Sequence, residues 1–223
     1  RHSIHLQYFI WAVDPFTDRV KQILIEKASA GVEVRLLYDP IGSQAHVDRR
    51  YVRDMLAAGV KMAPTSPFYH LHTISYRNHR KITVIDGAIG YTGGMNIGQE
   101  HLDGGEGFDS WRDTQVRLVG ESAAVLQAVF MVDWYNATRE NLFFAKYFPP
   151  NAKAPAAAHV PVQILTSGPD SQWAAIRQVY AFMIFSAQHH VYLQSPFFIP
   201  DVTIAEALRE TAMSGVDVKV MVS

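Results

Sequence analysis

The sequence predicts a mixed α/β fold, and three observations support that prediction. Short apolar segments typical of buried strands alternate along the chain with amphipathic segments at helical spacing. Glycines stand where several of those helices would end, in the position that favours a left-handed backbone. Two stretches far apart in the chain share one strand–helix–strand pattern. We therefore expect a sheet whose crossover helices cover both of its faces.

The expected elements follow from the periodicity of the apolar residues. In the first part of the chain we expect strands at 4–12, 32–38, 60–63, 81–86 and 114–119, and helices at 18–30, 47–58 and 122–141. Gly31 and Gly59 end the first two helices. In the last part we expect strands at 162–166, 190–194 and 216–222, with helices at 172–187 and 204–214.

An internal repeat relates the two ends of the chain. Ile4–Gln7 (IHLQ) resembles Val191–Gln194 (VYLQ), and Ala30–Leu37 (AGVEVRLL) resembles Ser214–Met221 (SGVDVKVM). The two pairs are offset by 187 and 184 residues, so both copies keep nearly the same internal spacing. A chance similarity between strand–helix–strand units is the alternative interpretation.

The domain organisation follows from this repeat and from composition. Residues 147–161 (YFPPNAKAPAAAHVP) are rich in proline and alanine, as expected of a linker. We predict a first lobe at 1–147, a linker at 148–161 and the beginning of a second lobe at 162–223. The chain opens directly on a strand-like segment, so we interpret it as a fragment whose second lobe is truncated.

Charge and composition exclude several classes of protein. The 223 residues are 48% hydrophobic and 18% charged, as in a globular protein, and their formal net charge of -1 argues against a general nucleic-acid binder. There are no cysteines, which excludes disulfides and thiolate metal sites. No apolar run reaches the ~18–20 residues of a membrane span. We expect the chain as given to be soluble or peripheral.

The segment 77–96 (RNHRKITVIDGAIGYTGGMN) carries the strongest motif in the chain. Its spacing matches the phospholipase D superfamily signature, HxKxxxxD followed by GGxN, with Gly94 where serine is also common. A chance match of six fixed positions has a probability of about 10⁻⁸ per starting point. The six positions are His79, Lys81, Asp86, Gly93, Gly94 and Asn96.

The resemblance extends along nearly the whole chain. The stretches RNHRKITVIDG, TGGMNIGQEHL, SWRDTQVRLVG, VRLLYDPIGS and SPFFIPD look like those of bacterial cardiolipin synthases. That family implies two α/β lobes, each of which contributes one such motif to a shared cleft. It also implies transfer of a phosphatidyl group from one phosphatidylglycerol to another, with release of glycerol, and needs no metal or other cofactor. The second motif is missing here, and by the repeat spacing it would lie about 40 residues beyond Ser223.

The spacing of the motif suits phosphoryl chemistry. Residues i and i+2 of a strand point to the same face, so His79 and Lys81 project together. Lys81 can neutralise a phosphate oxygen while His79 approaches the phosphorus. Glycines at 93 and 94 let the backbone come close to the substrate, and Asn96 supplies an amide donor to a second phosphate oxygen. The remaining histidines, including His101, are interpreted as structural or surface groups.

Three carboxylates complete the set of candidate site residues. The resemblance assigns Asp86 a supporting role, and a structural aspartate at the end of a strand is the alternative. In the superfamily a carboxylate after the GGxN turn orients a catalytic histidine, and Asp113 matches that place. Glu100 is a further candidate. For Asp113 and Glu100 the alternative is an ordinary surface carboxylate.

The expected mechanism is covalent. Neutral His79 attacks the phosphodiester and forms a phosphohistidine, while a second histidine on the missing half protonates the departing glycerol. Which of the two histidines attacks stays open. Water in place of an alcohol would give phospholipase D hydrolysis. A phosphodiester nuclease of the same superfamily and an inactive lipid-binding fragment are also compatible with the motif.

The resemblance also implies partners and a location. We expect phosphatidylglycerol as the substrate, contact with a membrane surface, and no nucleic acid. A homodimer or the missing second lobe would complete the site, and we expect the fragment alone to be inactive. The location expected is the bacterial cell membrane, peripheral for this fragment, with N-terminal helices that it lacks anchoring the full-length protein.

Overall fold

The structure is a computed structural model that describes residues 2–43, 47–65, 77–104, 110–150, 160–168 and 171–222. It divides into two compact units, Arg1–Ile164 and Leu165–Ser223. The central part of the expected linker, residues 151–159, lies outside the described residues. The three-part domain division stays a prediction.

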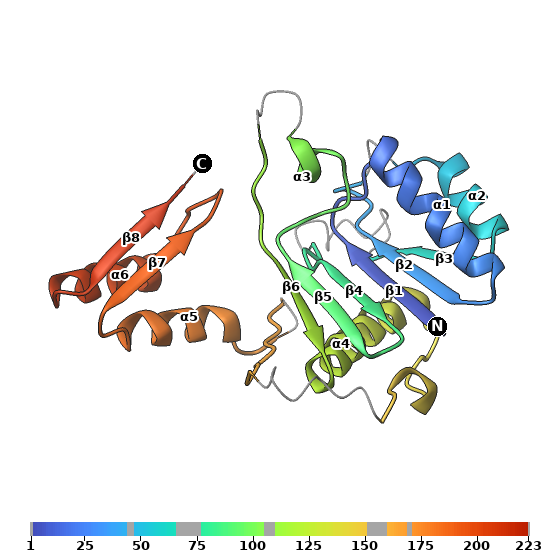
Figure 1. Cartoon of the computed structure of the whole chain (residues 1–223). Helices are drawn as coiled ribbons and strands as arrows, with labels where there is room; N and C mark the ends of the chain where they lie inside the picture. Colours follow the sequence, from blue (N-terminus) through green and yellow to red (C-terminus); the bar gives the residue numbers. More distant parts are fainter. Residues whose placement is uncertain are drawn as a thin grey trace. The chain divides into compact units, whose positions relative to one another are not determined.

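The first unit is built on a six-stranded mixed sheet with the strand order β3-β2-β1-β4-β5-β6 (Figure 1). Strands β1, β2 and β3 run parallel to one another, whereas β4, β5 and β6 are joined by antiparallel pairing, and β4 is antiparallel to β1. The predicted α/β class is therefore confirmed. The strands are β1 (Ser3–Tyr8), β2 (Glu33–Tyr38), β3 (Lys61–Pro64), β4 (Ile82–Ile85), β5 (Ile89–Gly93) and β6 (Gln115–Val119).

Helices cover both faces of this sheet, as expected (Figure 1). Helices α1 (Pro15–Ser29) and α2 (Arg49–Ala57) pack on one face, where Leu36 is fully buried. Helix α4 (Glu121–Thr138) packs on the other face, where Leu37 is fully buried. Adjacent residues of one strand thus enter two different cores, because side chains alternate along a strand. A short helix, α3 (Glu100–Asp103), follows β5, and a single 3₁₀ turn spans Ala145–Tyr147.

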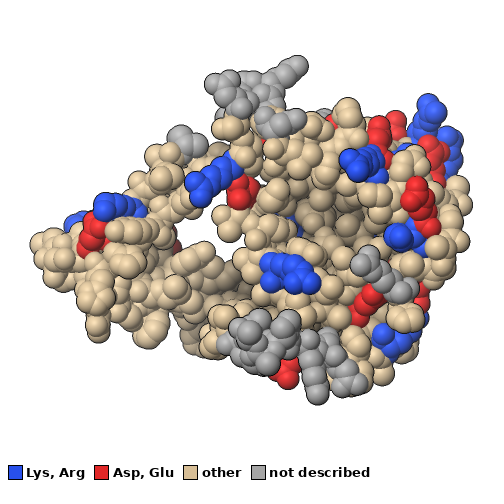
Figure 2. Space-filling model, in the orientation of Figure 1, with Lys and Arg blue, Asp and Glu red and all other residues tan. Residues whose placement is uncertain are grey.

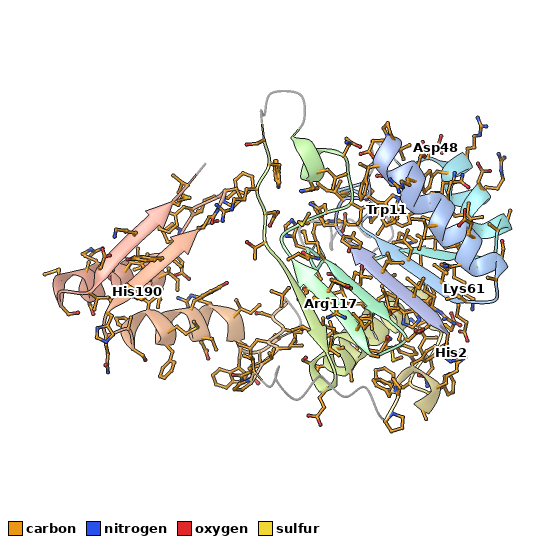
Figure 3. All side chains as sticks on the ribbon, viewed as in Figure 1. His2, Trp11, Asp48, Lys61, Arg117 and His190 are labelled. Atoms are coloured by element: carbon orange, nitrogen blue, oxygen red, sulfur yellow. The ribbon has the colours of Figure 1, made fainter. Side chains whose placement is uncertain are left out.

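The mixed strand directions bring several loops to one edge of the sheet. Because β4 is antiparallel to β1, β4 begins beside the end of β1. For the same reason β5 ends, and β6 begins, at that edge. His2 and Trp11 mark the two ends of β1 in Figure 3. The motif residues that precede β4 and follow β5 therefore meet at the Trp11 end of the sheet.

The second unit repeats the opening pattern of the first. It contains α5 (Ala175–Phe185), β7 (His190–Gln194), α6 (Val202–Met213) and β8 (Asp217–Met221), with β7 and β8 parallel. In the first unit Ile4 pairs with Val34, and in the second Val191 pairs with Val218. These are the equivalent positions of the repeat in the sequence. The two copies therefore share their strand register as well as their spacing.

The glycines that close the helices of the two copies also correspond. Gly31 has a φ of +83° and Gly215 a φ of +94°. A side chain would strain this left-handed backbone, so both positions favour glycine. The predicted ends of the two helices are confirmed by this geometry.

Several sequence predictions differ from the structure, and the strand expected at 4–12 ends at Tyr8. No strand forms at 162–166, although all five residues are described. Ile164 instead packs as a side chain against the core of the first unit, so an apolar run was mistaken for a paired strand. The helix expected at 122–141 ends at Thr138, because Arg139 adopts a left-handed φ of 64°.

We predict a pH-dependent loss of stability that comes from His5. Its ring is fully buried, stacks on Phe130 and is hydrogen-bonded to Gln127. Burial lowers the pKa of His5 from 6.5 to about 4. The unfolded chain therefore takes up the proton first, and stability falls as the pH drops below 6.5. The free energy of unfolding should decrease by about 2 kcal/mol between pH 7 and pH 5.

Urea unfolding at several pH values measures this loss, and His5→Phe is the comparison. The variant removes the titrating group, so its unfolding free energy should depend less on pH over the same range. The pKa values of His79 and His101 are also lowered by burial, so some dependence remains in the variant. Equal slopes for the two proteins would contradict the assignment to His5.

Candidate active site

His79 and Lys81 lie together just before β4, at the edge of the sheet where β1 ends. The Nζ atom of Lys81 is 3.1 Å from Nδ1 and 3.2 Å from Nε2 of His79, and it donates to the backbone oxygen of His79 at 2.9 Å. The ring of Phe9, from the end of β1, lies 4.6 Å from the His79 ring and 5.5 Å from Lys81 Nζ. The Lys81 ammonium and the His79 imidazole thus both lie near the ring of Phe9.

The neighbours of these two residues point to the opposite face of the chain. Asn78 donates to Asp133 of α4 at 2.8 Å, and Arg80 forms an ion pair with the same carboxylate at 2.6 Å. Gln7 of β1 also donates to Asp133, at 2.6 Å. One carboxylate on α4 therefore holds alternate residues of the motif segment. This anchoring directs the other two, His79 and Lys81, away from α4.

Burial lowers the pKa values of both Lys81 and His79. Only 4% of Lys81 is exposed, and this burial lowers its pKa from 10.5 to about 8, although Asp113 opposes the shift. Burial and the neighbouring Lys81 both lower the pKa of His79, against the opposing effect of Asp39. At neutral pH the site therefore holds a neutral imidazole, which is the nucleophilic form, beside a cation that can receive a phosphate oxygen.

Asn96 is positioned by the backbone that follows β1. Ile10 donates its amide to Asn96 Oδ1 at 3.1 Å, and the Ile97 amide donates to the Ile10 oxygen at 3.2 Å. Ala12 also donates its amide to the Ile97 oxygen at 2.9 Å, so the segment after β1 pairs with the segment after β5. Because Oδ1 of Asn96 is held by an N–H group, its amide NH₂ is the end that can donate to a ligand.

The two glycines before Asn96 leave room for β6 and the residues that precede it. A Cβ on Gly93 would lie 2.3 Å from the backbone oxygen of Thr114 and 2.3 Å from Gln115 Oε1. A Cβ on Gly94 would lie 2.2 Å from Oδ1 of Asp113. The carboxylate of Asp113 therefore sits directly over Gly94, where it also accepts from the Thr114 amide at 2.7 Å.

Glu100 reaches this region through His101. A carboxylate oxygen of Glu100 is 3.5 Å from His101 Nε2, which also accepts the Asn96 amide at 3.3 Å. The His101 ring is buried and lies edge-on to Trp111 at 5.0 Å. Sequence reasoning assigned His101 a structural or surface role, and the structure shows it buried, where it accepts the backbone amide of a candidate site residue. Its position five residues after Asn96 was the available signal.

Two further residues at this edge were missed by sequence reasoning. Asp39 follows β2, is fully buried and accepts the amides of Ile41 and Gly42. Arg77 lies 3.7 Å from its carboxylate. Asp39 is close enough to His79 to act on its pKa. The aspartate lies in the stretch VRLLYDPIGS, but strand periodicity gives no indication that it would approach residues 40 positions away.

Asp86 lies elsewhere. It occupies the turn after β4, with a left-handed φ of 56°, at the end of β4 that is remote from Lys81. Its Oδ1 accepts the amides of His2 and Ser3 at 2.6 and 3.0 Å. The structure thus brings together His79, Lys81, Gly94, Asn96, Asp113 and Glu100 but not Asp86, which ties the start of β1 to the turn.

Among the described residues, no group of three histidine, aspartate or glutamate side chains is arranged to hold a metal ion. The site presents the imidazole of His79, the ammonium of Lys81 and the carboxamide of Asn96, with the carboxylate of Asp113 nearby. Together they provide a nucleophile and two donors for phosphate oxygens.

The sequence of the first unit matches a known family. The profile described as "Cardiolipin synthase, PLD-like domain" matches residues 1–134, more than half of the chain. The chain belongs to this family. The expected resemblance to the phospholipase D superfamily is therefore confirmed.

Curated members of the family are similar over the whole chain. The cardiolipin synthase of Geobacillus thermodenitrificans is 42% identical over 224 residues, and that of Geobacillus sp. (strain WCH70) is 43% identical over 227 residues. In each case the match covers 99% of this chain and 44% of the relative. The chain thus spans less than half the length of these cardiolipin synthases.

A solved structure shows the same fold. The crystal structure of phosphatidylserine synthase from Haemophilus influenzae matches with a TM-score of 0.65 at 15% sequence identity. The match covers 99% of this chain and 56% of that protein. This likeness supports the fold class that the sheet order already establishes.

We predict that the two motif glycines differ in what they tolerate. Gly93→Ala should lower the free energy of unfolding by about 2 kcal/mol, because its Cβ would meet the backbone of Thr114 and cannot be relieved by a side-chain rotation. Gly94→Ala should cost less than about 1 kcal/mol, because the Asp113 carboxylate can turn away. Urea denaturation of the two variants measures this difference. Equal losses would show that Asp113 is held as rigidly as the backbone.

Proposed function

We propose that this chain carries the nucleophilic half of a phosphatidyltransferase site. His79 attacks the phosphorus of a phospholipid and forms a covalent phosphohistidine. The observation that carries the proposal is the contact of a buried ammonium, Lys81, with both ring nitrogens of a histidine whose pKa is lowered. This arrangement keeps the imidazole unprotonated and places a cation next to the attacked group.

Two hydrogen-bond donors stabilise the negative charge on the phosphate oxygens. Lys81 receives one phosphate oxygen, and the NH₂ group of Asn96 receives another. Gly94 allows a substrate oxygen to approach the backbone closely. Asp113 lies over Gly94 and acts electrostatically on Lys81, so it serves as a positioning residue for the phosphate pocket. Glu100 takes no direct part, because Nε2 of His101, the nitrogen nearest its carboxylate, accepts the Asn96 amide and has no proton to donate.

The proposed reaction is a displacement at phosphorus. The bond from His79 to phosphorus forms, and the bond from phosphorus to the headgroup oxygen breaks. The leaving alkoxide takes a proton from a general acid, a histidine of a second motif in another lobe or another copy of the chain. An incoming hydroxyl then reverses the sequence. The hydroxyl of a second phosphatidylglycerol gives cardiolipin and frees the histidine.

The names of the relatives support this substrate. They are cardiolipin synthases, and they imply that the substrates are phospholipids and that the protein works in association with a membrane. In the described part of the chain, no helix combines the length and apolarity needed to cross a bilayer. We propose, from the similarity to cardiolipin synthases, that the full-length protein works at the bacterial cell membrane.

Hydrolysis is the second candidate, and it uses the same intermediate with water as acceptor. A phosphodiester nuclease is disfavoured by charge. On the face shown in Figure 2, acidic and basic side chains are interspersed among uncharged ones, with no continuous basic stripe among the described residues. Counterion-release binding to nucleic acid needs such a stripe.

We predict that His79→Ala in the full-length protein abolishes phosphatidyl transfer without unfolding the protein. The His79 side chain is exposed, so its removal costs little packing. The measurement is thin-layer separation of lipid products, with far-ultraviolet circular dichroism as the folding check. His189→Ala, which removes an exposed histidine of the second unit, is the matched control. Recovery of the radiolabelled lipid phosphate on a peptide other than that of His79 would assign the nucleophile elsewhere.

We predict a pH profile set by His79 and Lys81. The rate at low substrate should rise as His79 loses its proton, with this limb below pH 6.5 because its pKa is lowered. The rate should fall above about pH 8, as Lys81 loses the charge that binds phosphate. Lys81→Arg keeps its charge and should shift the falling limb upward, at a lower maximum rate. An unchanged falling limb in this variant would contradict the role of Lys81.

A further inference from the structure

Asp39 is a buried carboxylate at the edge of the sheet that carries His79 and Lys81. It follows β2 directly, and β2 ends beside the end of β1 because the two strands are parallel. Among the described residues, Asp39 is the one aspartate or glutamate that is fully buried. Removing a carboxylate from water costs free energy unless its oxygens find partners. The proposed reaction makes no use of Asp39.

One oxygen of Asp39 closes the turn of residues 39–43 that follows β2. Its Oδ1 accepts the amides of Ile41 at 2.9 Å and Gly42 at 3.0 Å. Ser43 donates its amide to the backbone oxygen of Asp39 at 3.0 Å. These bonds need only a neutral oxygen, which an asparagine would supply equally well. The turn alone therefore does not explain why a charged group is buried here.

The same turn packs against the segment that follows β1. A Cβ on Gly42 would lie 2.4 Å from the backbone oxygen of Phe9 and 3.0 Å from Cε1 of its ring, so glycine allows this close approach. Ser43 Oγ donates to the same Phe9 oxygen at 3.2 Å. The Phe9 ring in turn lies 4.6 Å from the His79 ring. The turn that Asp39 holds therefore supports the imidazole from behind Phe9.

The second oxygen of Asp39 faces the segment that carries His79. Oδ2 lies 3.7 Å from Nη1 of Arg77, two residues before His79, and accepts from Thr65 Oγ1 at 3.4 Å. Only 17% of the Arg77 side chain is exposed, so water screens this ion pair less than a surface pair. An asparagine could not form the ion pair. The charge of Asp39 therefore serves its contact with Arg77.

Carboxylates hold the motif segment at two points. Asp133 on α4 accepts from Asn78 at 2.8 Å and pairs with Arg80 at 2.6 Å. The ion pair of Asp39 with Arg77 holds the same segment from the end of β2. The proposed nucleophile lies between these contacts, so a shift at either one would move its ring.

We propose that Asp39 is a positioning residue for His79. It acts through its ion pair with Arg77 and through the turn that packs behind Phe9. The inference rests on the proposed function, in which His79 is the nucleophile. A displacement of about 1 Å at a reacting group can cost about 10²-fold in rate, so a residue that touches no substrate can still set the rate.

Charge gives a readout that a purely structural residue would not change. Burial lowers the pKa of His79 most, Lys81 lowers it further, and Asp39 raises it. Among the described residues, these two are the charged groups that act on the ring. Removal of the Asp39 charge therefore lowers the pKa of His79. The rising limb of the kcat/KM profile should then move to lower pH.

The test replaces Asp39 by asparagine in the full-length protein. Asp39→Asn keeps an oxygen for the amides of Ile41 and Gly42 and removes the charge. We expect kcat for phosphatidyl transfer to fall about 10-fold, with KM little changed and the rising limb at lower pH. The control is Asp48→Asn, at the exposed N-cap of α2, where the carboxylate accepts the Tyr51 amide at 2.7 Å. It should change neither kcat nor the limb.

A double-mutant cycle tests the contact with Arg77. Arg77→Gln removes the other member of the ion pair and should lower kcat by a similar factor. If Asp39 acts through this pair, the double variant should have a kcat within about twofold of the worse single variant. Losses that multiply would show that the Asp39 charge does not act through Arg77 and would overturn the inference.

The outcomes separate the inference from the proposed function. Folded Asp39→Asn protein with the kcat and the rising limb of the wild type would make Asp39 a turn residue only and overturn the inference alone. If Asp39→Asn does not fold, an unchanged kcat in Arg77→Gln overturns it in the same way. A wild-type protein that forms no phosphohistidine at His79 would overturn the proposed function, and the inference with it.

Discussion

The candidate site depends on the backbone pairing between the segment that follows β1 and the segment that follows β5. Ile10 and Ala12 pair with the backbone of Ile97, and Ile10 also donates its amide to the side-chain oxygen of Asn96. Phe9, immediately before them, packs against His79. The two halves of the HxKxxxxD and GGxN signature are separated by strands β4 and β5, and this bridge fixes the distance between them. Backbone bonds of this kind depend little on side-chain identity, so the geometry can be kept while neighbouring residues vary.

Burial then affects the protonation of the two titrating side chains, His79 and Lys81. Lys81 sits against Phe9 and His79 with almost no exposure, and the resulting loss of hydration lowers the pKa values of both titrating groups. A cation that is poorly hydrated interacts more strongly with an incoming phosphate, because less water has to be removed when the substrate binds. The nearby carboxylate of Asp113 limits how far the pKa of Lys81 falls, which keeps the ammonium charged at neutral pH.

A cavity of about 220 Å³ lies beside Asn96 on the same face of the sheet, and its described lining side chains are uncharged. Lys81 and Asp113 are not among its lining residues, whereas Tyr8, Thr83 and Gln115 present uncharged groups to it. The side-chain alternation of a strand places both regions on one face, and α1 and α3 supply the walls of the cavity.

The sequence by itself determined the α/β class, the internal spacing of the repeat and the common direction of His79 and Lys81, because periodicity and fixed spacing are visible in the residues themselves. It left the role of Asp86 open between a supporting group and a structural turn, and it gave His101 a structural or surface role. Only the tertiary structure shows where these two residues lie. The antiparallel β4 carries residue 86 to the far end of the sheet, and the short helix α3 returns residue 101 to the backbone of Asn96. The apolar run at 162–166 was wrong as a strand for the same physical reason: strand pairing and loop position are set by distant partners, which local patterns do not encode.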